Sequence, residues 1–99
     1  MDLGEITEKL RARVGDNSGL DATVKFDFGD DGLIFVDAAS DPNTVSNDDK
    51  EADCTIRISM ANFVKLMEGD MDPTTAFMMG RLKVEGSMGI AMKLSKIVG

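Results

Sequence analysis

The sequence contains no histidine, tryptophan or tyrosine, and Cys54 is its one cysteine. A Ser-His-Asp or Cys-His relay needs an imidazole or an equivalent base beside the nucleophile. A structural zinc site needs several Cys or His ligands, and a disulfide framework needs at least two cysteines. No acid and base stand at a convincing catalytic spacing. We therefore predict a protein that is not an enzyme, with no catalytic residues, no metal ligands and no cofactor.

Basic residues are outnumbered by acidic ones, 11 to 18, and the net charge is −7. Residues 1–53 hold 14 acidic and 5 basic side chains, whereas residues 54–99 hold 4 acidic and 6 basic ones. Phosphate neutralisation supplies most of the non-specific affinity for nucleic acids. The charge balance therefore argues against a nucleic-acid partner, while the C-terminal half suits an anionic head group or surface.

Targeting and membrane-spanning signals are absent from the sequence. Residues 1–5 have neither the basic start nor the apolar run of a signal peptide. No stretch approaches the roughly 18 apolar residues that a membrane span needs. The last three residues, 97–99, differ from the peroxisomal tripeptide address. From these features we expect a cytoplasmic protein.

The 99 residues predict a single domain, residues 1–99. Apolar residues at helical spacing predict a helix over residues 3–14, ended by Gly15. Alternation predicts a strand over residues 22–28, and the turn at residues 29–32 connects it to a second strand at 33–36. Residues 44–46 fit a short edge strand, and the acidic run at 47–51 fits a solvated loop.

The second half of the chain alternates helices and strands. Cys54 alternates with isoleucines in a strand over residues 54–58, which predicts that its thiol is buried. Ser59 and Asp72 are typical N-caps, for helices that end at Gly69 and Gly80. A strand at residues 81–85 and a last helix from the turn at 86–87 to about residue 98 follow. The pattern predicts an α+β domain with helices over one face of a mostly antiparallel sheet.

The last predicted helix has an unusually wide apolar arc. At about 100° per residue this arc spans about 220°, whereas a surface helix that packs once needs little more than ~100°. One part of the arc is branched aliphatic, which suits a sheet, and the other is Met and Ala. Methionine is flexible and polarisable, so it suits an adaptable contact. The helix therefore needs two apolar partners.

Methionines cluster around this helix: six of the eight lie between Met67 and Met92, among them Met78, Met79 and Met88. A methionine cluster at helical spacing is most often simply core. The other interpretations are that it covers a bound apolar ligand, a second subunit or a membrane surface.

Residues 52–94 resemble one protein family. The chain reads Ala52-Asp53-Cys54-Thr55-Ile56, then Gly69, Asp72-Pro73 and Ala76-Phe77-Met78-Met79-Gly80. It continues as Arg81-Leu82-Lys83-Val84-Glu85-Gly86-Ser87-Met88-Gly89-Ile90-Ala91-Met92-Lys93-Leu94. This resembles the sterol carrier proteins, also called nonspecific lipid-transfer proteins, whose most recognisable stretch is G-K-L-K-I-x-G-N-M-G-x-A-M-K-L. The chain differs there by Arg81 for the first Lys, Val84 for Ile and Ser87 for Asn.

The resemblance implies a five-stranded, mostly antiparallel sheet covered on one face by helices, with an apolar tunnel between the two layers. It implies non-covalent binding of fatty acids, fatty acyl-CoA, sterols or phospholipids with broad specificity. Carried over position by position, the tunnel wall consists of Phe63, Met67, Phe77, Met78, Met88, Ile90, Ala91, Met92 and Leu94.

We expect an anionic head group at the mouth of the cavity, attracted by Arg81, Lys93 or Lys96. The last helix and residues 72–80 then act as a movable cover. The expected partners are the lipid or fatty acyl ligand and, transiently, a membrane surface or an enzyme that uses acyl-CoA; the chain itself is expected to be a monomer. The competing interpretation is an interaction or dimerisation module that uses the same apolar surface against a protein.

An empty lipid-sized cavity is costly for so small a domain. At ~24 cal/mol per Å³, a closed void of ~300 Å³ would cost about 7 kcal/mol. That is comparable with the entire ~5–15 kcal/mol stability of a small domain. The cavity must therefore hold a ligand, collapse around its methionines or be covered by another molecule.

Overall fold

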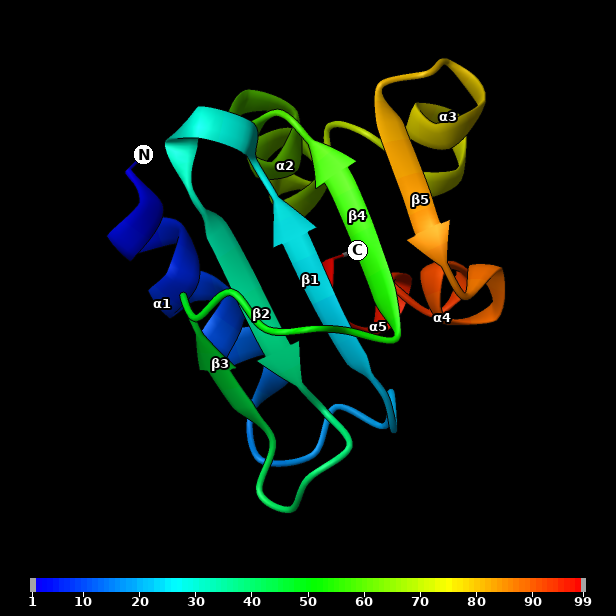
Figure 1. Cartoon of the computed structure of the whole chain (residues 1–99). Helices are drawn as coiled ribbons and strands as arrows, with labels where there is room; N and C mark the ends of the chain where they lie inside the picture. Colours follow the sequence, from blue (N-terminus) through cyan, green and yellow to red (C-terminus); the bar gives the residue numbers. More distant parts are fainter. Residues whose placement is uncertain (1, 99) are drawn as a thin grey trace.

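The computed structural model describes residues 2–98, and at its centre lies a five-stranded sheet (Figure 1). The strand order is β3-β2-β1-β4-β5. β1 and β4 are parallel, and every other neighbouring pair is antiparallel. The predicted mostly antiparallel α+β fold is confirmed. The strands are β1 (Thr23–Asp27), β2 (Leu33–Asp37), β3 (Thr44–Ser46), β4 (Cys54–Ile58) and β5 (Leu82–Gly86).

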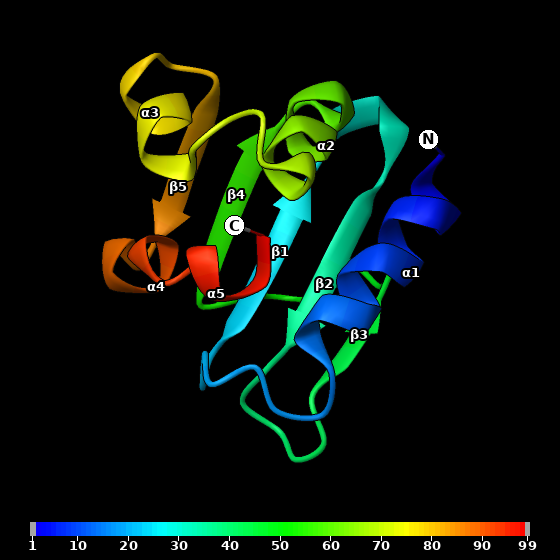
Figure 2. The same cartoon turned by 180° about the vertical axis from the view of Figure 1, so that it is seen from behind.

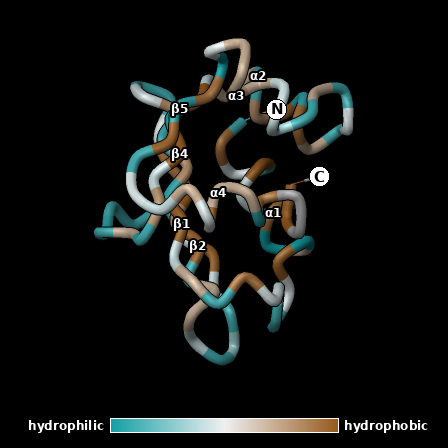
Figure 3. The backbone as a smooth tube through the Cα atoms, turned by 90° about the vertical axis from the view of Figure 1, so that its right-hand side faces the viewer, coloured by the Kyte–Doolittle hydropathy of each residue, from teal (hydrophilic) through white to brown (hydrophobic). Residues whose placement is uncertain are grey.

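The helices cover one face of the sheet, as Figure 2 shows from behind. Figure 3 shows the two layers edge-on, with the strands on the left and the helices on the right. A short 3₁₀ turn, η1 (Gly29–Asp31), connects β1 to β2. The α-helices are α1 (Leu3–Val14), α2 (Met60–Glu68), α3 (Pro73–Met78), α4 (Met88–Met92) and α5 (Ser95–Val98).

The predicted caps Ser59, Gly69 and Asp72 are confirmed, whereas α3 ends at Met78 with Met79 as its C-cap, slightly before the predicted end at Gly80. The Ser59 hydroxyl accepts a hydrogen bond from the Asn62 N–H at 3.1 Å, and the Asp72 carboxylate accepts one from the Thr75 N–H at 3.0 Å. Gly69 ends α2 in the left-handed region, with φ of 81°. These local signals act within one turn of chain, which is why sequence reasoning places α2 correctly.

The core lies between the sheet and the helices. Every second residue of β1 and β4 points into it, and Cys54 is fully buried, as the alternation predicts. The Phe63 ring from α2 packs against Phe26 and Phe28, with ring centroids 4.8 and 5.1 Å apart. The space beneath the centre of the sheet is therefore filled by the chain's own side chains.

The prediction of one continuous last helix is wrong, because the chain breaks between α4 and α5. The Lys93 N–H donates to the Ile90 carbonyl at 2.9 Å, and the Leu94 N–H donates to the Ala91 carbonyl at 3.2 Å. These bonds span three residues instead of four, so they tighten the turn and redirect the chain. The redirection buries Leu94, Ile97 and Val98, as the aliphatic part of the arc requires.

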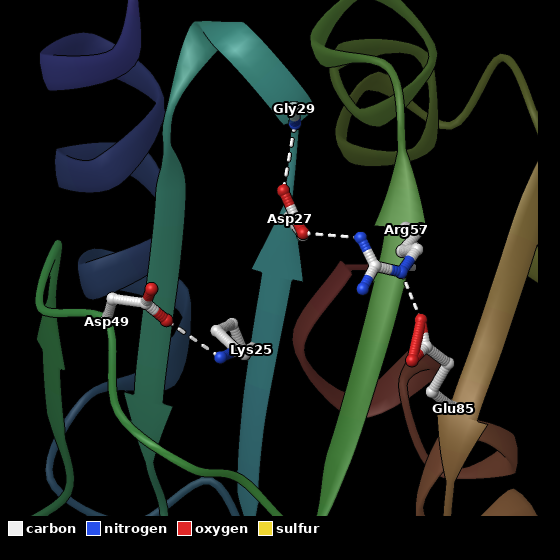
Figure 4. Close-up of polar contacts among 6 residues, drawn as sticks. All are labelled: Lys25, Asp27, Gly29, Asp49, Arg57 and Glu85. Carbon is white, nitrogen blue, oxygen red and sulfur yellow. Dashed lines mark hydrogen bonds and ion pairs between the residues drawn. The ribbon is translucent and has the colours of Figure 1, made fainter.

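The face of the sheet opposite the helices is polar, and Figure 4 shows its contacts. Lys25 pairs with Asp49 at 2.8 Å, and the loop that carries Asp49 crosses this face (Figure 1). Arg57 lies between Asp27, at 2.8 Å, and Glu85, with which it also forms an ion pair. Ion pairs therefore occupy the face that no helix covers.

Candidate functional site

A groove of about 400 Å³ lies at the β5 edge of the molecule, between α3, β5 and α4. Its wall is mostly apolar, with polar groups confined to the start of α3. The lining residues are Asp72, Pro73, Thr74, Phe77, Leu82, Val84, Met88, Ala91, Met92 and Leu94.

The floor of the groove is the inner face of β5. Leu82 and Val84 lie opposite Ile58 and Ile56 of β4, so they share the face that points toward the helices. Leu82 is 3% exposed. Because β5 is an edge strand, its apolar face extends the core to the margin of the molecule, where only short helices cover it.

The turn after β5 fixes the position of α4. Gly86 has φ of +97°, and a Cβ added there would lie 2.5 Å from the Asp53 carbonyl oxygen. The Ser87 N–H donates to that same oxygen at 3.1 Å, and its hydroxyl accepts from the Ile90 N–H at 3.3 Å. Only glycine allows this close approach and this backbone conformation, so the Gly-Ser pair both turns the chain and caps α4.

The side of the groove that faces outward is formed by exposed side chains. Met92 is 81% exposed, Met88 47% and Phe77 43%, whereas Leu94 is 1% exposed. The groove is thus apolar at its base and open to solvent at its rim. An open groove admits water, so the cost of an empty closed cavity does not apply to it in full.

The structure brings together five of the nine predicted wall residues. Phe77, Met88, Ala91, Met92 and Leu94 line the groove.

The other four lie elsewhere. Phe63 and Met67 are buried in the core, Ile90 is half-buried against it, and Met78 is 79% exposed outside the groove. Sequence reasoning missed Leu82 and Val84, although their alternation with Arg81 and Lys83 was a signal for an inward face.

The predicted head-group residues are not gathered at one point. Lys93 is exposed and directly follows Met92 of the groove. Arg81 lines a second hollow of about 350 Å³, together with Arg57, Lys83 and Ser59. The side chain of Lys96 is outside the described part of the chain. The charged positions of β5 thus lie on the outer face, separated from the apolar groove by the strand.

Near the second hollow, the ion pair between Arg57 and Glu85 shifts the pKa values of both side chains. The hydrogen bond and charge of Arg57 lower the pKa of Glu85, and Glu85 in turn raises the pKa of Arg57. Burial, and then the charge of Asp53, raise the pKa of the Cys54 thiol. A buried neutral thiol is a poor nucleophile, so Cys54 acts as a core side chain.

Residues 5–99 match the SCP-2 sterol transfer family. Sterol carrier protein 2 of Homo sapiens is 47% identical over 55 residues, which are 56% of this chain and 10% of the relative. Sterol carrier protein 2 of Gallus gallus is 43% identical over 70 residues, 70% of this chain and 13% of the relative. The chain thus spans about a tenth of the length of these curated relatives.

Solved structures agree with the fold. The apo form of sterol carrier protein 2 from Yarrowia lipolytica has a TM-score of 0.71 at 22% identity, covering 95% of this chain and 77% of that one. The sterol carrier protein domain 2 of Helicoverpa armigera has a TM-score of 0.68 at 27% identity, covering 92% and 80%. With a sheet, a groove and a family match over residues 5–99, the chain belongs to the SCP-2 sterol transfer family.

Proposed function

We propose that the groove between α3, β5 and α4 binds the acyl chain or ring system of a lipid without covalent change. The observation that supports this is the continuous apolar wall from buried Leu82 and Leu94 to exposed Met88 and Met92. Apolar pockets of ~300–1,000 Å³ with a few polar groups are typical of small-molecule sites, and the groove falls in this range.

The chemistry of the wall favours broad specificity. Methionine side chains repack cheaply around ligands of different shape, and a flexible wall discriminates poorly. Fatty acids, fatty acyl-CoA, sterols and phospholipids are therefore all candidate ligands. Lys93, beside the rim, attracts an anionic carboxylate or phosphate. We propose carriage without catalysis, since the groove lining has one ionisable side chain, Asp72, and this carboxylate caps α3.

The proposed tunnel requires α4 to move. Ile90 lies on α4 and packs against the core that contains Phe63 and Met67. Displacement of α4 from β5 extends the groove toward these side chains and would bring them against the ligand. The tight turn at Lys93 and Leu94 is the hinge in this proposal, because α5 stays packed in the core.

The test is a titration of delipidated protein with a fluorescent fatty acid. We expect saturable binding and a rise in melting temperature, since ligand at 100 times Kd stabilises the folded state by about 2.7 kcal/mol. Absence of both would refute the proposal.

The competing function is an interaction or dimerisation module, which the exposed hydrophobic side chains of α3 and α4 favour. Light scattering of the delipidated protein separates the two functions. A monomer that binds fatty acid supports the carrier, whereas a tight dimer that buries Met88 and Met92 supports the module.

A further inference from the structure

The groove between α3, β5 and α4 has polar side chains at one place, the start of α3. Asp72 and Thr74 supply them, and the other eight lining residues are apolar. In a mostly apolar site the few polar groups fix the orientation of the ligand. We therefore expect the polar end of a ligand in this groove to lie beside Asp72 and Thr74.

Asp72 is a negatively charged group with one oxygen free to accept hydrogen bonds. Its Oδ2 accepts from the Thr75 N–H at 3.0 Å and from the Thr75 hydroxyl at 3.5 Å. Its Oδ1 has no hydrogen bond or ion pair within residues 2–98. A carboxylate accepts hydrogen bonds and donates none, so a partner at Oδ1 must bring a donor.

The start of α3 offers few donors to an anion. The first N–H groups of a helix often bind anions, but Pro73 has no N–H. The Thr75 N–H is bound by the Asp72 carboxylate, and the Ala76 N–H donates to the Asp72 carbonyl at 2.9 Å. In the described part of the chain the Thr74 hydroxyl has no hydrogen-bond partner. The polar end of the groove therefore presents a carboxylate and a free hydroxyl.

The cations near β5 lie outside the groove. Among the described side chains, no lysine or arginine lines it. Arg81 lines the second hollow, and Lys83 lies opposite Arg57 on the outer face of the sheet. Lys93 caps α4, is exposed and does not line the groove, so it draws an anion to the rim. Within the groove, a negative head group meets Asp72 without a compensating cation.

We propose that Asp72 makes the groove selective for lipids with an uncharged hydroxyl head group, at the expense of lipids with a carboxylate or phosphate. A hydroxyl has one donor and two acceptor lone pairs, so it donates to Asp72 Oδ1 while it accepts from the Thr74 hydroxyl. A carboxylate or phosphate accepts only from Thr74 and is repelled by Asp72. This inference rests on the proposed function, because it names the candidate lipids that the groove favours.

The test compares dodecanol with dodecanoate, which share a chain length and differ in head-group charge. Their affinities are measured by displacement of a fluorescent fatty acid from the delipidated protein. We expect dodecanol to bind more tightly. Asp72→Asn keeps a capping side chain of the same shape and removes the charge. It should lower the ratio of the two affinities about fivefold, the effect of two like charges ~4 Å apart in water. Added salt should lower this ratio in the wild type, because exposed charges are screened, and should not do so in Asp72→Asn.

The matched control is Asp2→Asn. Asp2 caps α1 as Asp72 caps α3, since its carboxylate accepts from the Glu5 N–H at 2.9 Å. α1 lies at the opposite side of the molecule from α3 and α4 (Figure 1). Asp2→Asn removes the same charge from the chain, yet it should leave the affinity ratio unchanged. Both variants should melt close to the wild type, because Asn and Asp are comparable N-caps.

Three outcomes overturn the selectivity. If fatty acid binds but Asp72→Asn leaves the affinity ratio unchanged, the head group does not lie at Asp72, while the proposed function stands. If dodecanoate binds more tightly than dodecanol and Lys93→Gln removes that advantage, the head group lies at the rim instead. If neither the fluorescent fatty acid nor dodecanol binds, the proposed function fails, and the role of Asp72 fails with it.

Discussion

Replacing Met92 by alanine is the most direct test of where a ligand lies. Met92 lines the groove and is 81% exposed. Complete burial of a methionine side chain contributes about 1.5–3 kcal/mol, so covering the exposed part gains at most about 2 kcal/mol. A ligand in the groove covers one side of the residue, roughly half of this surface, which amounts to about 1 kcal/mol.

We therefore expect Met92→Ala to weaken binding of a fluorescent fatty acid about fivefold, as 1.4 kcal/mol corresponds to tenfold. Folding stability should hardly change, since little of the side chain is buried. Met79→Ala is the matched control, because Met79 is 60% exposed on the neighbouring helix end but does not line the groove. Equal effects of the two substitutions, or none from Met92→Ala, would refute the placement of the ligand.

Three further predictions follow from the described contacts. Gly86→Ala should lower the free energy of unfolding by more than about 2 kcal/mol in urea denaturation, because the added Cβ meets the Asp53 carbonyl at φ of +97°; an unchanged midpoint would contradict the close approach. Arg57→Gln should raise the pKa of Glu85 toward its ordinary value of 4.5, followed by NMR titration. The folded-state pKa of Glu85 is lowered, so the Arg57–Glu85 pair stabilises the fold at a pH above the pKa of Glu85 in the unfolded chain. This stabilisation is lost as the pH falls through the pKa of Glu85 in the folded protein. The wild type and Arg57→Gln should therefore become equally stable in acid. Cys54 should react with iodoacetamide only after unfolding, because burial raises its pKa and closes access; rapid labelling of the native protein would show that β4 opens.

Local signals account for most of the fold that the sequence predicts. The boundaries of α2 and the start of α3 can be predicted from residue type alone, because the capping residues Ser59, Gly69 and Asp72 form hydrogen bonds with backbone groups within one turn. The edge position of residues 44–46 also follows from their short alternating run. The β1–β4 parallel pair, by contrast, joins residues about thirty positions apart, and no local pattern specifies it.

The site was predicted less completely than the fold. A helical wheel assumes one straight axis, so it missed the break at Lys93 and Leu94, where tertiary burial of Leu94 and Ile97 outweighs helix continuity. Resemblance placed Phe63 and Met67 on the wall of a tunnel, and in this structure they fill the core. Whether they meet a ligand depends on movement of α4, which composition and periodicity do not encode.

Because the chain breaks between α4 and α5, the two helices are held to the rest of the fold by different contacts. Arg13 of α1 donates hydrogen bonds to the carbonyls of Val98, at 3.1 Å, and of Met67, which tie α1 to α5 and to α2. α4 is attached through the Gly86–Ser87 turn and through its half-buried Ile90 and Ala91. If α4 moves as proposed, a lipid could enter and leave the groove beside α4 while α5 stays packed in the core, so the domain would not need to unfold in order to open.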